Sequence, residues 1–166
     1  MKIIEYKDWS IKSYDESTMK LHIPRQLIYH HTWLPRASNI GIETVRAIQK
    51  YHINANGWDD IAYHFIIDSL GSIFEGREII HIGSHCIPNT GKLGICMIGD
   101  YDPGQDIVTQ EMLNSLYELT KYLCNKFKIN YNEIYGHRDF YANKTCPGES
   151  IYQLIPMIKQ NLMNGV

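Results

Sequence analysis

The stretch His137-Arg-Asp-Phe-Tyr-Ala-Asn-Lys144-Thr-Cys146-Pro-Gly148 lies between two segments of predicted regular structure. A short β-prone run, Glu133-Ile-Tyr-Gly136, precedes it, and an amphipathic segment follows it. Imidazole and thiolate are side chains that zinc favours, and a loop of this length lets His137 and Cys146 reach one metal ion. Because isolated histidines and cysteines are usually packing or surface groups, a third ligand is needed to support a metal site.

A candidate third ligand lies far upstream, in the run Gln26-Leu-Ile-Tyr-His-His-Thr32. The run is rich in β-forming residues and is followed by a turn-prone proline, so we expect a strand. Adjacent strand residues point to opposite faces, so His30 and His31 cannot both face one site. His30, His137 and Cys146 would leave the fourth zinc position to water, as catalytic zinc sites do. The metal would lower the pKa of that water from about 15.7 to about 7.

The composition is that of an ordinary globular chain. Its 166 residues fit one domain with a real core, and 44% hydrophobic with 20% charged residues are usual values. The net charge of -2 and the scattered basic residues do not point to nucleic acid. Charges interrupt the first eight residues before an apolar leader core forms, and no run approaches the roughly 20 apolar residues of a membrane span. We therefore expect synthesis in the cytoplasm, without stable membrane insertion.

The four cysteines show no C-x-x-C spacing, which favours free thiols or metal ligands over a disulfide framework. Cys96 lies in an apolar run and Cys124 in a helical pattern, so we expect both in the core. Nothing in the sequence indicates a partner for Cys86.

The first half of the chain predicts one helix and a hairpin. The helix begins at Ser38 or Asn39 and runs to about Ile53, and its apolar positions are Ile42, Val45, Ile48 and Tyr51. A β-prone run ending at Ile67 and a returning strand, Ser72–Glu75, form a hairpin around the glycine-containing turn at 68–71. Residues 76–92 form a long connection of the kind that often lines a binding site.

The second half predicts a buried strand at Leu93–Ile98 and two more helices. Thr109 caps the first helix, whose apolar stripe we interpret as core: Met112, Leu113, Leu116, Leu119, Tyr122, Leu123 and Phe127. The last helix opens at Ser150 or Glu149, and Pro156 either bends it or limits its start. The fold class is therefore α/β, with a central mixed sheet of about five to six strands flanked by about three helices. Residues 1–25 are expected to form an N-terminal arm packed on a single domain, 26–166.

Five pieces of the sequence together resemble the zinc-dependent N-acetylmuramoyl-L-alanine amidases of the phage endolysin and peptidoglycan-recognition-protein type. In chain order they are Ile28-Tyr-His30-His-Thr32, Gly57-Trp-x-Asp60-Ile-x-Tyr63-His-Phe65, Gly83-Ser-His85, Leu93-Gly-Ile-Cys-Met-Ile-Gly99, and Gly136-His137 with Lys144-x-Cys146-Pro147. Each piece alone is common, and each of its residues alone would be read as packing or surface. All five pieces occur in the family's order between about residue 26 and the end, and such an ordered match is not expected by chance.

The resemblance implies an amidase or peptidoglycan-recognition-like fold with a catalytic domain at 26–166. It implies that His30, His137 and Cys146 bind one Zn2+ ion and that Tyr63 and Lys144 complete the catalytic machinery. The family reaction cleaves the amide between N-acetylmuramic acid and L-alanine in bacterial peptidoglycan. In the family the loop of His85 borders the substrate groove, so His85 is a candidate substrate contact.

We therefore expect a monomeric phage or prophage endolysin, made in the cytoplasm and acting on the cell wall after release. Its partner would be the glycan strand and stem peptide of peptidoglycan. Two alternatives stay open: a peptidoglycan-binding module without catalysis, and a cytoplasmic amidase that recycles soluble muropeptides. The remaining histidines, His22, His31, His52 and His64, we assign to packing, caps or surface.

Overall fold

A six-stranded mixed sheet forms the centre of the structure, a computed structural model that describes residues 1–34 and 40–165. Its strands are β1 (Ile3–Ile4), β2 (Gln26–His31), β3 (Phe65–Ile67), β4 (Ile73–Glu75), β5 (Lys92–Met97) and β6 (Ile134–Gly136). They lie in the order β1-β4-β3-β5-β2-β6. β3 and β4 pair antiparallel, whereas the other neighbouring strands pair parallel. The expected α/β class and mixed sheet are confirmed.

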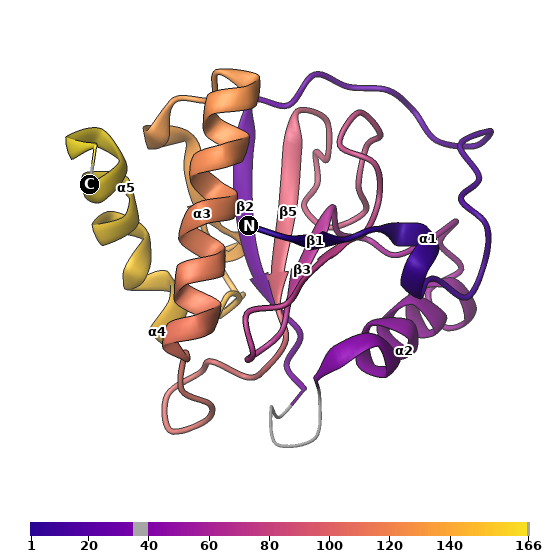
Figure 1. The fold of residues 1–166 in the computed structure, drawn as a ribbon, viewed down its shortest axis with the longest axis horizontal. Helices are drawn as coiled ribbons and strands as arrows, with labels where there is room; N and C mark the ends of the chain where they lie inside the picture. Colours follow the sequence, from indigo (N-terminus) through magenta and orange to yellow (C-terminus); the bar gives the residue numbers. More distant parts are fainter. Residues whose placement is uncertain (35–39, 166) are drawn as a thin grey trace.

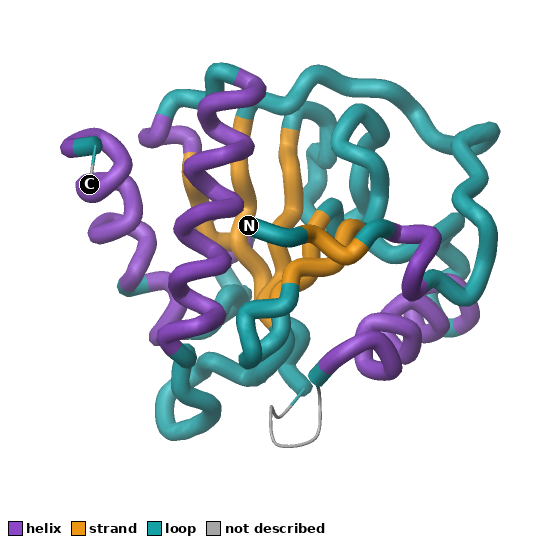
Figure 2. Tube along the Cα trace, in the orientation of Figure 1, coloured by secondary structure: helices purple, strands orange, loops and turns teal. Residues whose placement is uncertain are grey.

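Helices cover both faces of this sheet (Figures 1 and 2). The long helices are α2 (Gly41–Asn54), α3 (Gln110–Phe127) and α5 (Leu154–Asn164), and the short ones are α1 (Tyr6–Trp9) and α4 (Glu149–Tyr152). Two 3-10 turns, Tyr131–Glu133 and His137–Phe140, flank β6. In Figure 1, α3 and α5 lie to one side of the sheet, and α1 and α2 lie to the other. Within the described residues, no helix has both the length and the apolarity to cross a membrane.

Two hydrophobic cores result, one on each face. The larger core joins the sheet to α3, α4 and α5 and includes Tyr29, Ile95 and Leu119. The smaller core joins it to α1 and α2 and includes Val45 and Ile66. Burial of each such side chain contributes about 1.5–3 kcal/mol. Side chains alternate along β2: Tyr29 packs in the larger core, and His30 faces the side of α2. His31 accepts a hydrogen bond from the backbone N–H of Tyr101 and also contributes to the lining of the cavity that His30 lines.

The turn and cap predictions are confirmed. Asp68 Oδ1 accepts hydrogen bonds from the backbone N–H of Leu70 and Ser72, and Gly71 takes a φ of +77° to close the hairpin. The Thr109 hydroxyl accepts from the backbone N–H of Met112 at 3.2 Å and so begins α3. Pro156 lies in the first turn of α5, where its missing N–H costs no helical hydrogen bond.

Two residues of the predicted apolar series are exposed: Tyr51, an apolar position of the first predicted helix, at 62%, and Tyr122, which we interpreted as core, at 39%. A spacing of three residues falls short of the 3.6-residue period, so the series that began at Ile42 has rotated about half a turn by Tyr51. The buried positions of α2 follow the i, i+4 rows instead. Cys96 and Cys124 are buried in the core as expected. The predicted start of α2, at Ser38 or Asn39, lies outside the described residues.

The N-terminal residues share the sheet and core of the rest of the chain. β1 pairs in parallel with β4, and the Trp9 side chain is fully buried and donates its indole N–H to the carbonyl oxygen of Glu75 at 2.7 Å. The Tyr6 hydroxyl donates to Asp60 at 2.6 Å. The boundary that we placed at residue 25 stays a prediction.

Candidate metal centre

The candidate ligands converge because β2 and β6 are parallel neighbours. Tyr29 lies opposite Gly136, the last residue of β6, so His30 and His137 follow side by side at the same end of the two strands. Their ring centroids are 4.6 Å apart. The carboxyl ends of parallel strands are the usual location of ligand sites in α/β sheets. A contact across more than 100 positions of sequence is thus set by strand register.

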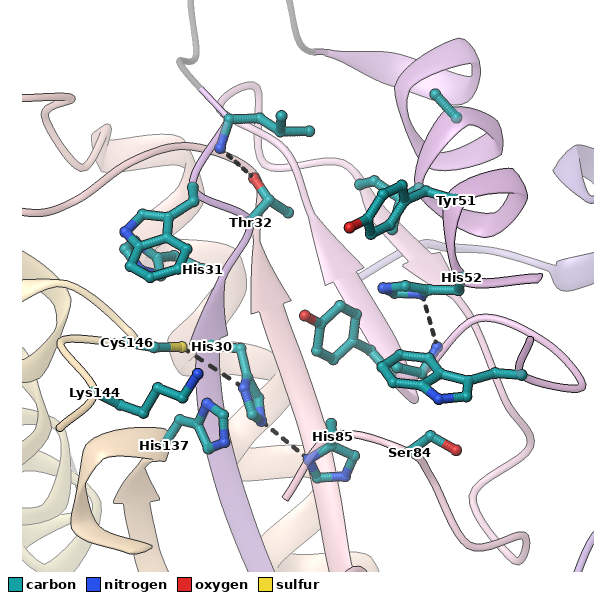
Figure 3. Close-up of a pocket in the computed structure, with 17 residues that line it drawn as sticks. His30, His31, Thr32, Tyr51, His52, Ser84, His85, His137, Lys144 and Cys146 are labelled. Atoms are coloured by element: carbon teal, nitrogen blue, oxygen red, sulfur yellow. Dashed lines mark hydrogen bonds between the residues drawn. The ribbon is translucent and has the colours of Figure 1, made fainter. Parts of the chain in front are cut away.

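Cys146 reaches this point through a loop that Arg138 closes. The backbone N–H of Arg138 donates to the carbonyl oxygen of Cys146 at 2.8 Å, and its guanidinium donates to the Thr145 carbonyl at 2.9 Å. The same guanidinium pairs with Glu149 at 2.7 Å. These bonds bring the Cys146 Sγ to 3.7 Å from the Nδ1 atom of His30 (Figure 3).

The three side chains fit a zinc ion. One ligand atom from each of His30, His137 and Cys146 lies within 4.8 Å of the other two. Tetrahedral zinc with ordinary Zn–N and Zn–S bonds separates a nitrogen from a sulfur by about 3.5 Å, close to the 3.7 Å between His30 Nδ1 and Cys146 Sγ. Among the described residues this group supplies three ligands, which is the number that leaves one position open for water or substrate.

Burial tunes both imidazoles towards the neutral form that binds metals. It lowers the pKa of His30 well below the usual 6.5, with neighbouring histidines adding to the effect. Burial also lowers the pKa of His137 to about 4, helped by the positive charges of Lys144 and Lys92. Burial raises the pKa of the Cys146 thiol to about 12, although the backbone of His31 and the charge of Arg138 oppose this. A cation at the centre would favour the thiolate, as metal coordination does.

Tyr63 and Lys144 flank the ligands. The Tyr63 ring centroid lies 5.2 Å from that of His30. Burial, followed by the nearby Cys96 and Cys146 thiols, raises the pKa of Tyr63 well above its usual 10, so the hydroxyl stays protonated and can donate at neutral pH. Lys144 is exposed, and its side chain extends beside Cys146 and His137 in Figure 3.

These residues line one cavity of about 630 Å³. The three candidate ligands, Tyr63, Lys144 and His85 all contribute to its lining. Across the cavity, Tyr51 and His52 form a second wall (Figure 3). Trp58 also lines the cavity, and its ring centroid lies 5.0 Å from that of His52. A mostly apolar cavity with a few convergent polar groups is the usual form of a small-molecule or catalytic site.

His85 lies deeper than a simple groove contact. It is 8% exposed, and its Nδ1 atom is 2.9 Å from the Nε2 atom of His30. Its role as a substrate contact stays a prediction. By contrast, His22, His52 and His64 each accept a backbone N–H through Nδ1, from Gly91, Ala62 and Gly94 respectively, which fits the packing and capping roles expected of them.

The sequence did not indicate three features of this site. The first is the contact of His85 with His30, which joins residues 55 positions apart. The second is the closure of the loop by Arg138, for which its place directly after His137 is a weak signal. The third is the wall opposite the metal centre, since the sequence indicated Tyr51 only as one of the apolar positions of its helix.

Fold and site together define an α/β protein with a candidate mononuclear zinc centre at the ends of parallel strands. The chain belongs to the N-acetylmuramoyl-L-alanine amidase family, whose model matches residues 20–149. Among curated relatives, an N-acetylmuramoyl-L-alanine amidase of Sus scrofa is 24% identical over 89% of this chain. The matched part is 25% of the length of that protein. Peptidoglycan-recognition protein SC1a of Drosophila melanogaster is 32% identical over 67% of this chain and 60% of its own length.

A solved structure shares the fold. The endolysin and N-acetylmuramoyl-L-alanine amidase LysCS from Clostridium intestinale URNW superposes with a TM-score of 0.77 at 28% identity. The match covers 94% of this chain and 93% of that one. The amidase-like fold expected from the sequence is confirmed.

Proposed function

We propose that this chain is a zinc-dependent amidase that hydrolyses the amide between the lactyl group of N-acetylmuramic acid and L-alanine in bacterial peptidoglycan. The observation that carries the proposal is the convergence of His30, His137 and Cys146 on one point of a cavity that Tyr63 and Lys144 also line. Membership of the amidase family and the names of the relatives support the choice of substrate.

Each of the five residues has a chemical role in this proposal. Zinc held by His30, His137 and Cys146 would supply a Lewis acid and lower the pKa of water. Amide hydrolysis builds negative charge on the carbonyl oxygen, and the Lys144 ammonium lies where it can stabilise that charge. Tyr63 can orient the attacking water, relay its proton or donate a hydrogen bond to the same oxygen. The raised pKa of Tyr63 favours donation.

The wall opposite the metal centre suits the non-reacting part of the substrate. Tyr51 and Trp58 present half-exposed aromatic faces to the cavity. Such faces pack against apolar surfaces of a sugar ring or a peptide with little loss of side-chain freedom. Binding energy from this wall would position the scissile amide beside the metal centre.

The biological role that we propose is that of an endolysin, made in the cytoplasm and acting on the wall after release. The LysCS relative, which is named an endolysin, supports this role. To test it, the chain is expressed inside bacteria with and without a pore-forming protein of the inner membrane. Loss of turbidity only when the pore is present supports the proposal. Lysis without the pore, or survival of permeabilised cells, contradicts it.

The activity itself is tested by mass spectrometry of purified sacculi. Digestion should release stem peptides that carry an L-alanine amino terminus and leave the glycan strands uncut. A chelator should abolish the products, and added Zn2+ should restore them. Glycan fragments, or products that persist without metal, would contradict the amidase assignment.

A recognition module without catalysis is the second candidate, because the SC1a relative is named a recognition protein. Binding to sacculi with no release of peptides would support it. The same digestion with soluble muropeptides tests a third candidate, a recycling enzyme. Cleavage of soluble muropeptides alone, with sacculi left intact, would support that candidate.

A further inference from the structure

We propose that His85 is a positioning residue for the metal centre: it holds the His30 imidazole so that Nδ1 faces the metal. This inference rests on the zinc site in the proposed function. The Nε2 atom of His30 is 2.9 Å from His85 Nδ1, and the Nδ1 atom of His30 is 3.7 Å from Cys146 Sγ. The two imidazoles meet edge to face, with centroids 4.9 Å apart and an interplanar angle of 86° (Figure 3).

The direction of this hydrogen bond follows from the chemistry of imidazole. A neutral histidine has one ring nitrogen with a hydrogen and one with a free lone pair. A metal needs the lone pair, so Nδ1 of His30 must be bare and Nε2 must carry the hydrogen. His30 therefore donates to His85 Nδ1, and His85 carries its own hydrogen on Nε2. Metal-binding histidines usually donate their second N–H to a carboxylate, a carbonyl or water, and here an imidazole takes that place.

His85 is itself held in place, as a positioning residue must be. Asn89 Oδ1 accepts from the backbone N–H of His85 at 2.8 Å and from that of Cys86 at 2.7 Å. The Tyr141 hydroxyl accepts from the backbone N–H of Ile87 at 2.7 Å, and the Tyr141 ring packs edge-on against His137. The loop that carries His85 therefore contacts both His30, through His85, and Tyr141, whose ring packs against His137.

The strand beneath His85 is shaped to receive the ring. A Cβ atom built on Gly94 of β5 would lie 2.8 Å from the His85 ring, and one on Gly83 would lie 2.6 Å from it. Both positions therefore need glycine for the imidazole to reach His30. The neighbouring residue on this face of β5, Cys96, lies opposite His30 in the strand register. The loop, the two glycines and the register together fix one orientation of the His30 ring.

The test compares His85→Ala, His85→Asn and a control, His22→Asn. Alanine removes the acceptor, whereas the oxygen of asparagine can replace His Nδ1. His22 makes two ring hydrogen bonds to backbone, with Gly91 and Ile79, and does not line the cavity, so its replacement tests the general cost of losing a hydrogen-bonded, partly buried imidazole. Circular dichroism of each metal-free variant establishes that it is folded. If His85→Ala does not fold, the comparison is made with His85→Asn.

Two measurements follow, and neither needs activity. Competition with a chelator should show a 10- to 100-fold weaker zinc affinity in His85→Ala, a loss of roughly the size found for removed outer partners of metal ligands. His85→Asn should recover most of the affinity, and His22→Asn should keep it. Long-range 1H–15N spectra of the metal-free protein should place the His30 hydrogen on Nε2 in the wild type and on a mixture of both nitrogens in His85→Ala.

Unchanged zinc affinity and an unchanged His30 tautomer in His85→Ala would overturn the inference and leave the proposed function intact. A variant in which only KM for peptidoglycan rises would likewise overturn it and assign His85 to substrate contact. A wild-type protein that binds no zinc would overturn the proposed function, and the inference with it.

Discussion

The two walls of the cavity are built in different ways. On the metal-centre wall, hydrogen bonds hold the candidate ligands or the loop that carries them: His85 bonds to His30, and Arg138 bonds to the backbone of Thr145 and Cys146. On the opposite wall, Tyr51 is 62% and Trp58 is 36% exposed, and a hydrogen bond from the backbone of Ala62 holds His52. Directional bonds dominate one wall, and exposed aromatic area dominates the other.

This difference separates two tasks. Reacting groups have to be held within fractions of an ångström, which requires directional bonds on rigid elements. A surface that binds a long polymer needs area and tolerates small shifts. We therefore expect changes in the metal-centre wall to lower turnover or metal binding, and changes in the opposite wall to weaken substrate binding alone.

The largest effect is expected from Cys146→Ser. Loss of the thiolate removes one of three candidate ligands, so zinc should be lost and activity on sacculi should fall by roughly 10³-fold, because a catalytic metal supplies several kcal/mol of transition-state stabilisation. Metal content and peptide release measure this. The control is Cys124→Ser, which changes a buried thiol of α3. Full activity of Cys146→Ser would refute the ligand assignment.

A smaller effect on the same wall is expected from Tyr63→Phe. The change removes only a hydroxyl, so zinc should remain bound while kcat falls by about 10²-fold, in the range of general acid–base catalysis. Steady-state kinetics with a soluble muropeptide measure it, and Tyr122→Phe on the exposed face of α3 is the control. An unchanged kcat would make Tyr63 a packing residue.

The buried side chain of His64 should make the metal-free protein sensitive to acid. Burial lowers the pKa of His64 to about 3. Because the unfolded chain binds this proton near pH 6.5, stability is complete above that pH and falls as the pH drops towards 3. At pH 5 the loss from His64 alone is about 2 kcal/mol. Urea unfolding at pH 7 and pH 5 measures it. In His64→Asn the difference should shrink, and equal wild-type stabilities at both values would contradict the prediction.

The smallest effect is expected on the opposite wall, from Trp58→Ala. Loss of one aromatic face should raise KM by about 2- to 10-fold, equivalent to roughly 0.5–1.5 kcal/mol. Zinc content and kcat should stay at the wild-type level. Kinetics with soluble muropeptides separate the two constants. A fall in kcat with unchanged KM would show that the two walls do not divide their tasks as we propose.

Local signals were enough to predict most of the fold. The strand containing His30, the hairpin around Gly71 and the helix capped by Thr109 all carry turn, cap or alternation signals within a few residues. β1 was missed because Ile3 and Ile4 alone show no periodicity, and parallel pairing with β4 depends on a segment about 70 positions away. Tyr51 does not share the buried face of Val45 and Ile48 because a three-residue spacing follows the helical period only over a short distance.

The candidate site was predictable where it follows an ordered motif, and hidden where it depends on packing. His30, His137 and Cys146 could be grouped by ligand chemistry and the resemblance, and the structure brings them together. The support that His85 gives to His30 depends on the loop bonds to Asn89 and on the space above Gly94. These are long-range packing relations that residue types and local spacing do not specify.

The parallel pairing of β2 with β6 also has a consequence for the order of folding. His137 and Cys146 follow His30 by more than 100 residues, so the ribosome releases the complete ligand set only long after the strand that carries His30. Non-local parallel pairing is also intrinsically slow. In refolding experiments, zinc capture followed with a chromogenic chelator should therefore lag behind the recovery of helical signal. The metal centre would then report that the chain has finished folding.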